Sequence, residues 1–144
     1  MMLHEVKIGI TKSLGKEFEQ INIYTDNIRQ GLDAPCFLVT PLISTEENLL
    51  DNRYERSYPF MIQYFPKKDA YQEECAEVQD KLFNCLEYID VSGNAVRGND
   101  MRGRIVNDIL NFEVTYNFMV WKVRASAEES ELMQTLEQHI IEKE

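Results

Sequence analysis

The residues that could do chemistry are few and lie far apart in the sequence. The two histidines, His4 and His139, stand near opposite ends of the chain and form no HExxH or HxH pattern, so their spacing indicates no metal site. Cys36 lies in an apolar run, where burial would raise the pKa of its thiol and make it a poor nucleophile. We therefore predict no catalytic residue, no metal ligand and no cofactor.

The cysteine count points to reduced thiols. The chain has three cysteines at wide spacing, Cys36, Cys75 and Cys85, which match neither a disulfide framework nor a zinc signature. Cys75 and Cys85 fall on one predicted helix, where ten residues separate them by about 15 Å along the axis, too far for a disulfide. We expect all three to be buried and free.

Three acidic doublets could in principle supply an acid–base pair. They are Glu46-Glu47, Glu73-Glu74 and Glu128-Glu129. The last two fall in the first turn of predicted helices, where the helix dipole favours carboxylates. The first, together with Asp51, belongs to a polar stretch that is predicted to be a flexible hairpin loop or a short helix. None of them indicates catalysis.

Basic residues gather in two short segments. One is Arg53-Tyr54-Glu55-Arg56 with Tyr58, a composition that suits either a protein interface or a plain sheet. The other runs from residue 97 to 104 and has two glycines, but a strand follows it, so it matches no phosphate-binding loop. It is a hairpin loop with solvated bases or a contact patch for an acidic neighbouring subunit. The candidate interface residues are Arg53, Arg56, Tyr58, Arg97, Arg102 and Arg104.

The overall charge limits the possible partners. There are 25 acidic and 15 basic residues, a net charge of −10, which argues against sequence-specific binding of nucleic acid because that affinity comes mainly from neutralising phosphates. The longest apolar runs, such as residues 36–39, are far too short to span a bilayer. The first residues lack the pattern of a secretory signal, so we expect an intracellular protein without membrane contact.

Apolar periodicity predicts the secondary structure. Helices are expected over residues 2–18, 69–87 and 126–140, with capping pairs at Asp69 and Ser126. Strands are expected over 21–24, 36–42, 53–65, 88–91, 95–97 and 105–123, with turns at 92–94 and 98–100. The last is one strand, or two joined by a bulge, with one dry face and one wet face, and the even positions from Leu110 to Val120 are expected to be buried. Pro59 cannot donate to a ladder, which predicts an edge strand or a bulge there.

This order of elements predicts an α+β fold. Short connections between the later strands favour antiparallel pairing, in a twisted sheet of about five to six strands with helices packed mainly on one face. The length of 144 residues and the absence of a linker predict a single domain over residues 1–144.

Short pieces along nearly the whole chain resemble the phage tail terminator family of Gram-positive tailed phages and prophages. The matching pieces follow an amphipathic N-terminal helix in a characteristic order and spacing. They are Ile23-Tyr24-Thr25, Gln30-Gly31, Pro35-Cys36-Phe37, Arg53-Tyr54-Glu55-Arg56-Ser57-Tyr58, Tyr64-Phe65-Pro66, Leu86-Glu87-Tyr88-Ile89 and Asn107-Asp108-Ile109-Leu110-Asn111-Phe112.

The resemblance implies a structural role in virion assembly and no enzymatic activity. Such proteins form a ring, usually of six subunits, on the completed tail tube, where they stop tube polymerisation and present a surface to head-completion or connector proteins. The implied partners are other copies of the chain, the tail tube protein and a head-completion protein, first in the host cytoplasm and then in the virion tail. We further hypothesise that Glu46, Glu47 and Asp51 face the ring's channel, where acidic groups would repel passing DNA.

Two alternatives stay open from sequence alone. One is a head-closure or other neck protein, which would also be small, acidic and rich in strands. The other is a small-ligand-binding or enzymatic α+β domain with an apolar pocket rimmed by Tyr54, Tyr58 and Tyr116.

Overall fold

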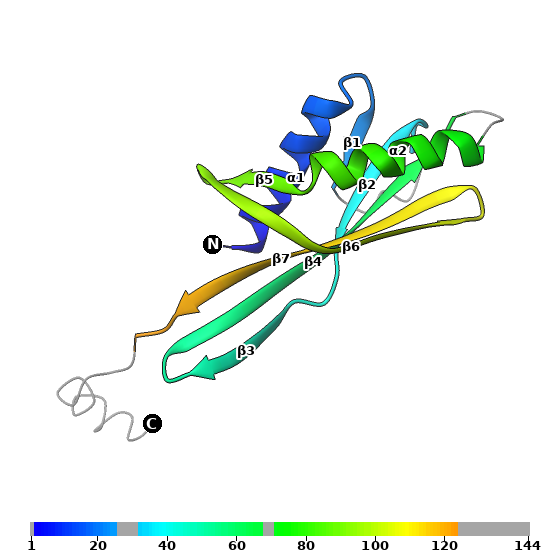
Figure 1. The fold of residues 1–144 in the computed structure, drawn as a ribbon. Helices are drawn as coiled ribbons and strands as arrows, with labels where there is room; N and C mark the ends of the chain where they lie inside the picture. Colours follow the sequence, from blue (N-terminus) through cyan, green and yellow to red (C-terminus); the bar gives the residue numbers. More distant parts are fainter. Residues whose placement is uncertain (1, 26–31, 68–70, 124–144) are drawn as a thin grey trace. The chain divides into compact units, whose positions relative to one another are not determined.

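A computed structural model describes residues 2–25, 32–67 and 71–123, which form helices and a curled, mostly antiparallel sheet (Figure 1). The elements are α1 (Leu3–Glu17), β1 (Asn22–Tyr24), β2 (Cys36–Pro41), β3 (Thr45–Leu50), β4 (Arg53–Phe65), α2 (Tyr71–Cys85), β5 (Tyr88–Val91), β6 (Asn94–Val106) and β7 (Ile109–Trp121). The predicted α+β class is confirmed. The predicted cap at Asp69 and the predicted helix over 126–140 lie outside the described residues.

The strand order is β1-β2-β4-β7-β6-β5, and β3 pairs with β4. The pairs β2–β4, β5–β6 and β6–β7 are antiparallel, whereas the short β1 runs parallel to β2. The chain divides into two compact units, residues 1–46 with 56–118 and residues 47–55 with 119–144. They are described separately below.

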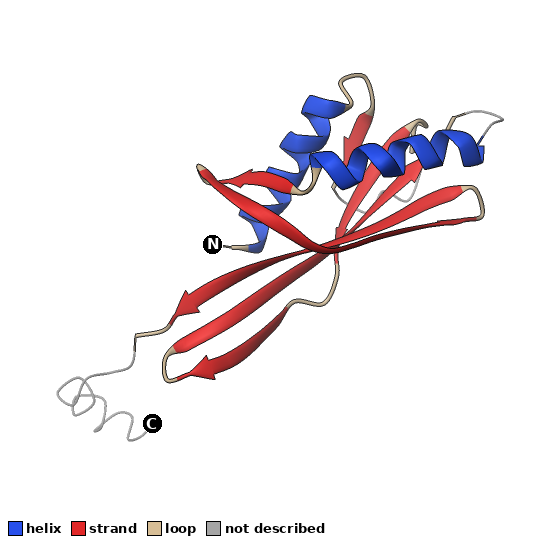
Figure 2. Ribbon diagram, in the orientation of Figure 1, coloured by secondary structure: helices blue, strands red, loops and turns tan. Residues whose placement is uncertain are grey.

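In the first unit, both helices cover one face of the sheet (Figure 2). The predicted helical stripes are buried, with Val6, Ile10 and Leu14 on α1 and Cys75, Val78 and Leu82 on α2. They pack into one core with alternate residues of the central strands, as the period of two predicts. The sheet contributes Phe37, Val39, Tyr58, Phe60, Ile62, Tyr64, Leu110, Phe112, Val114 and Tyr116.

The opposite face of this sheet, which we call the outer face, is polar. Its side chains alternate with the buried ones along β4, β6 and β7, and several are joined across strands. Ser57 donates to Asn117 at 2.6 Å, and Gln63 donates to Asn111 at 2.8 Å. These cross-strand bonds hold short uncharged side chains in place between β4 and β7.

The predicted strand over 105–123 is wrong at its start. β6 ends at Val106 and β7 begins at Ile109, because Asn107 and Asp108 form a two-residue turn with φ of 52° and 61°. Such hairpin turns need positive φ, which Asn and Asp tolerate better than most residues. From Leu110 to Tyr116 the even positions are buried as predicted.

The predicted turn over 98–100 and the hairpin loop over 97–104 are also wrong. These residues belong to β6, which continues through a register shift against β7 between Asn99 and Arg102. Asp100 has a φ of 51°, and the irregularity is therefore a bulge within a long strand. The glycines that suggested a loop are strand residues.

Two predictions about the β3–β4 region also need correction. The polar stretch after residue 44 is neither a flexible loop nor a helix but β3, which turns into β4 at Asp51, where φ is 52°. β4 is not an edge strand, since it lies between β2 and β7. The carbonyl of Pro59 accepts a hydrogen bond from the backbone N–H of Leu42, just beyond the end of β2. The N–H and C=O of one residue point to the same side of an antiparallel strand, so the N–H that proline lacks would also point there. Pro59 is tolerated because β2 no longer pairs with β4 at this point.

The described part of the second unit contains most of the β3–β4 hairpin and the end of β7. The backbone N–H of Lys122 donates to the carbonyl of Asn52 at 2.9 Å. The Arg53 guanidinium lies 5.4 Å from the centre of the Trp121 ring, and the ammonium of Lys122 lies 4.3 Å from that of Tyr54. The described part of this unit also has exposed apolar residues, namely Leu49, Leu50, Met119, Trp121 and Val123.

Candidate interaction surface

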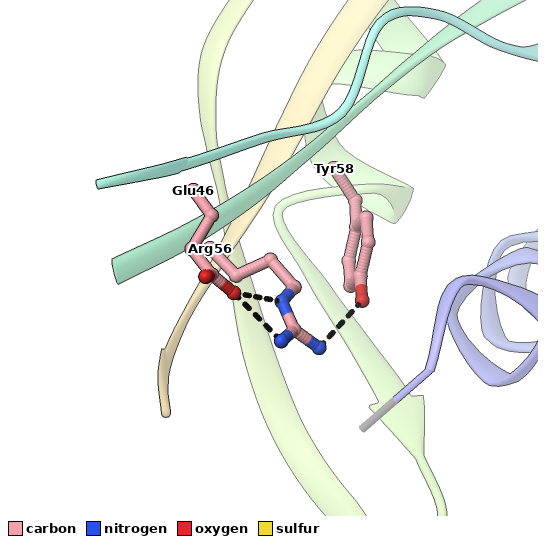
Figure 3. A network of polar contacts seen from close by, with 3 residues as sticks. All are labelled: Glu46, Arg56 and Tyr58. Atoms are coloured by element: carbon pink, nitrogen blue, oxygen red, sulfur yellow. Dashed lines mark hydrogen bonds and ion pairs between the residues drawn. The ribbon is translucent and has the colours of Figure 1, made fainter. Parts of the chain in front are cut away.

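The first group of predicted residues forms a polar network at the base of the β3–β4 hairpin (Figure 3). Arg56 donates from Nε at 3.0 Å and from a terminal nitrogen at 2.7 Å to one carboxylate oxygen of Glu46. Its other terminal nitrogen lies 3.4 Å from the Tyr58 hydroxyl. The Tyr58 bond and the Glu46 carboxylate both hold the pKa of Arg56 above its usual value.

This network joins residues that were predicted to have two different roles. Arg56 is a candidate interface residue and Glu46 a candidate channel residue, and the structure pairs them within one chain. Their side chains are 30% and 28% exposed, so the charges offset each other in a partly solvated setting. The remaining acidic candidates lie along the same hairpin, Glu47 exposed on β3 and Asp51 in its turn.

The basic candidates on β6 are strongly exposed. Arg102 donates to Glu113 of β7 at 3.0 and 3.2 Å, yet its side chain is 78% exposed. Arg104 is exposed and forms no ion pair with any residue in the described ranges. Arg97, before the bulge, lies 3.7 Å from Glu87 at the limit of an ion pair. Such exposed guanidinium groups can form new contacts at little cost in desolvation.

A shallow groove on the outer face was not predicted. It has a volume of about 1020 Å³ and crosses the sheet from the end of β2 to the bulge of β6. It is lined by Pro41, Leu42, Ile43, Pro59, Asp100, Met101, Arg102, Glu113 and Thr115. A second groove of about 560 Å³ shares Arg102 and Glu113 with it. The sequence signal was the apolar pair Leu42-Ile43 beyond the strand, of which Ile43 is 83% exposed.

The tyrosines proposed to rim a ligand pocket do not line these two grooves. Tyr116 is fully buried and donates to the backbone carbonyl of Leu86 at 2.7 Å. Tyr58 is 6% exposed, and Tyr54 lies beside Lys122 in the second unit. Tyr58 and Tyr116 are therefore side chains of one hydrophobic core, and Tyr54 belongs to the second unit.

The cysteines have the properties of inert thiols. Cys36 and Cys75 are buried, and Cys85 is partly buried. Burial is the main cause that raises the pKa of each thiol, for Cys85 to about 12. A thiol that keeps its proton near neutral pH is a poor nucleophile.

Two further features bear on what this surface can bind. Within the part of the chain that the structure describes, no three His, Cys, Asp or Glu side chains come together in a way that could hold a metal ion. Nor do the described helices include one with the length and apolar character needed to cross a bilayer. The outer face instead offers exposed guanidinium groups, cross-strand amides and an apolar rim.

Comparison with known families identifies the class of protein. A family model described as phage tail terminator protein matches residues 5–128. The chain belongs to the phage tail terminator family. The resemblance drawn from short motifs is thereby confirmed over most of the sequence, while a search of curated proteins gave no match.

Membership fixes the general role. The family is one of structural proteins, so this chain is a structural component of the phage tail, whose partners are other tail or head proteins.

Proposed function

We propose that the chain caps the completed tail tube as a ring of identical subunits, six by resemblance to the family, which ends tube polymerisation and forms the head–tail joining surface. Assembly takes place in the host cytoplasm, and residues 1–144 act as one terminator domain. The observation that carries the proposal is the family match over residues 5–128.

The distribution of charge supports a ring. A head-to-tail ring needs two different, complementary patches on every subunit, because each contact joins unlike surfaces. One patch is basic and lies on β6, where Arg102 and Arg104 are exposed. The other is the β3–β4 hairpin with Arg53, Arg56 and Tyr58, whose exposed acidic and apolar residues could meet a basic neighbour.

The acidic hairpin also supports a role in the channel. The chain carries a net charge of −10, and acidic groups that border a channel repel passing DNA and prevent it from sticking. Because Arg56 already offsets Glu46, we assign more of this effect to Glu47 than to Glu46.

Tube polymerisation tests the proposal directly. Tail tube protein is polymerised with and without this chain, and tube lengths and ends are examined by negative-stain microscopy. We expect a ring at one end of the tube and arrested growth. Tubes that keep growing with bare ends at saturating protein would overturn the proposal.

A further inference from the structure

One side of β6 is only partly covered by a neighbouring strand. β5 pairs with Asn94–Arg97, and beyond the bulge β6 pairs with β7 on its other side. Among the described residues, no backbone group bonds to the remaining side of residues 100–106. We call this side the basic edge, because this stretch of strand carries Arg102 and Arg104.

β3 has the second open side. Within the described ranges β4 is the strand that pairs with it, and every residue of β3 is exposed. Leu49 and Leu50 are 46% and 57% exposed, which is unusual for leucines in a strand. We call the side of residues 47–50 away from β4 the acidic edge, because this stretch of strand carries Glu47.

The side chains on these two edges have opposite charges. Gly103 faces Gln79 of α2 so closely that an added Cβ would lie within 2.2 Å of its side-chain oxygen, which turns Arg102 and Arg104 to the outer face. On β3, Glu46 pairs with Arg56 of β4, so the period of two places Glu47 on the opposite face of the sheet.

We propose that the acidic edge of one copy adds as a strand to the basic edge of the next copy, so that the ring is held by a sheet that continues from subunit to subunit. This rests on the proposed function. Backbone hydrogen bonds join the two edges, and Glu47 of one copy pairs with Arg104 of its neighbour. The same contact buries the apolar surface of Leu49 and of Val106, whose side chain is 38% exposed in the single chain.

The occupant is a second copy because opposite charges favour the pairing of unlike edges over the pairing of like edges. Two basic edges would bring arginines together and two acidic edges would bring glutamates together, and like charges at an interface cost several kcal/mol. A contact between an acidic edge and a basic edge repeats in one direction from subunit to subunit, as a ring requires. Strand addition also leaves the faces of both strands open, so Glu47 can lie at the seam and border the channel.

A charge swap tests the contact in the full chain with its tail tubes. We expect Glu47→Arg and Arg104→Glu each to lower the amount of ring by about tenfold, and the double variant to restore it. The matched controls are Glu77→Arg on α2 and Lys12→Glu on α1, both at exposed positions away from the edges. Thermal unfolding of each variant confirms that the fold is kept.

Hydrogen exchange measures whether the backbone amides of the basic edge become hydrogen-bonded, which a charge contact alone would not cause. The amides of residues 100–106 that face the basic edge should exchange at least about tenfold more slowly in the ring than in the free chain. Rings that form with unprotected amides and without rescue by the double variant would overturn this contact but leave the proposed capping function intact. A chain that neither self-associates nor caps tubes would overturn both.

Discussion

The hydroxyl of Tyr116 on β7 donates to the backbone carbonyl of Leu86, just beyond α2, at 2.7 Å, and both residues are fully buried. Burial raises the pKa of this phenol, which favours its protonated, donating form. The bond joins the centre of the sheet to the end of the helix that covers it.

Tyr116→Phe should therefore destabilise the protein by about 1–3 kcal/mol, because a buried carbonyl loses its donor. Urea unfolding measures the change. Tyr88→Phe is the control, since Tyr88 is 55% exposed and should shift the free energy of unfolding by less than about 0.5 kcal/mol. Equal effects of the two changes would contradict the role assigned to the bond.

Two glycines of α1 should respond to alanine with opposite signs. A Cβ on Gly9 would lie 2.7 Å from the backbone oxygen of Asp90 on β5, so Gly9→Ala must push the helix away and should cost about 1–3 kcal/mol. A Cβ on Gly15 would meet nothing closer than Ile23 at 4.0 Å, so Gly15→Ala should stabilise the helix by about 0.5–1 kcal/mol. Thermal unfolding of the two variants checks the pair.

The thiols should react slowly while the protein is folded. The pKa of Cys85 is raised by burial from 9.0 to about 12, so its protonated form is favoured in the folded state. The resulting stabilisation is complete below about pH 9 and is lost as the pH rises from 9 to 12. Alkylation with iodoacetamide at pH 8 should be far slower in the native protein than in urea. Comparable rates would show that Cys85 is accessible as a thiolate.

Charge reversal on the β3–β4 hairpin should weaken assembly more than folding. Arg53→Glu combined with Arg56→Glu removes an exposed ion pair worth less than about 1 kcal/mol, so the fold should persist. Across an interface the same reversal costs several kcal/mol. Light scattering and tube capping measure the loss, with Lys12→Glu combined with Lys16→Glu as the control. Identical oligomers and normal capping would reject these residues as contacts.

Acidic residues of the hairpin should affect DNA release. Lysine in place of Glu46, Glu47 and Asp51 should slow genome ejection or trap DNA, since a basic channel wall attracts phosphates. Because Glu47 also belongs to the proposed seam, the rate is measured on filled, fully assembled particles. The control places lysine at three exposed acidic positions of α2, Glu73, Glu77 and Asp80. Unchanged infectivity with unchanged ring assembly would count against the channel role.

Much of the core was predictable because burial follows simple periods. The stripe from Val6 to Leu14 and the alternation from Leu110 to Tyr116 both appear in the structure as the sequence indicates. The turn at Asn107-Asp108 was missed because apolar residues continue on either side of it in the same alternation. Composition gave no sign of β3, whose residues are exposed and mostly polar.

The candidate surface was less predictable than the core. The pairing of Arg56 with Glu46 depends on how the β3–β4 hairpin aligns residues that are ten apart in the sequence, and no local pattern fixes that alignment. The groove on the outer face likewise brings together residues from β2, β4, β6 and β7. The apolar residues of its rim can be recognised in the sequence, but the sequence does not show which strands lie beside them.

The bulge in β6 decides which way the arginines point. Before it, the even-numbered Val96 and Gly98 face the helices, and after it the odd-numbered Met101 and Ile105 do. The extra residue thus shifts the alternation by one. If β6 ran on as a regular strand with all its residues, Arg102 and Arg104 would turn under α2, whereas removal of the one extra residue would leave both guanidinium groups outward and should cost far less than a buried charge.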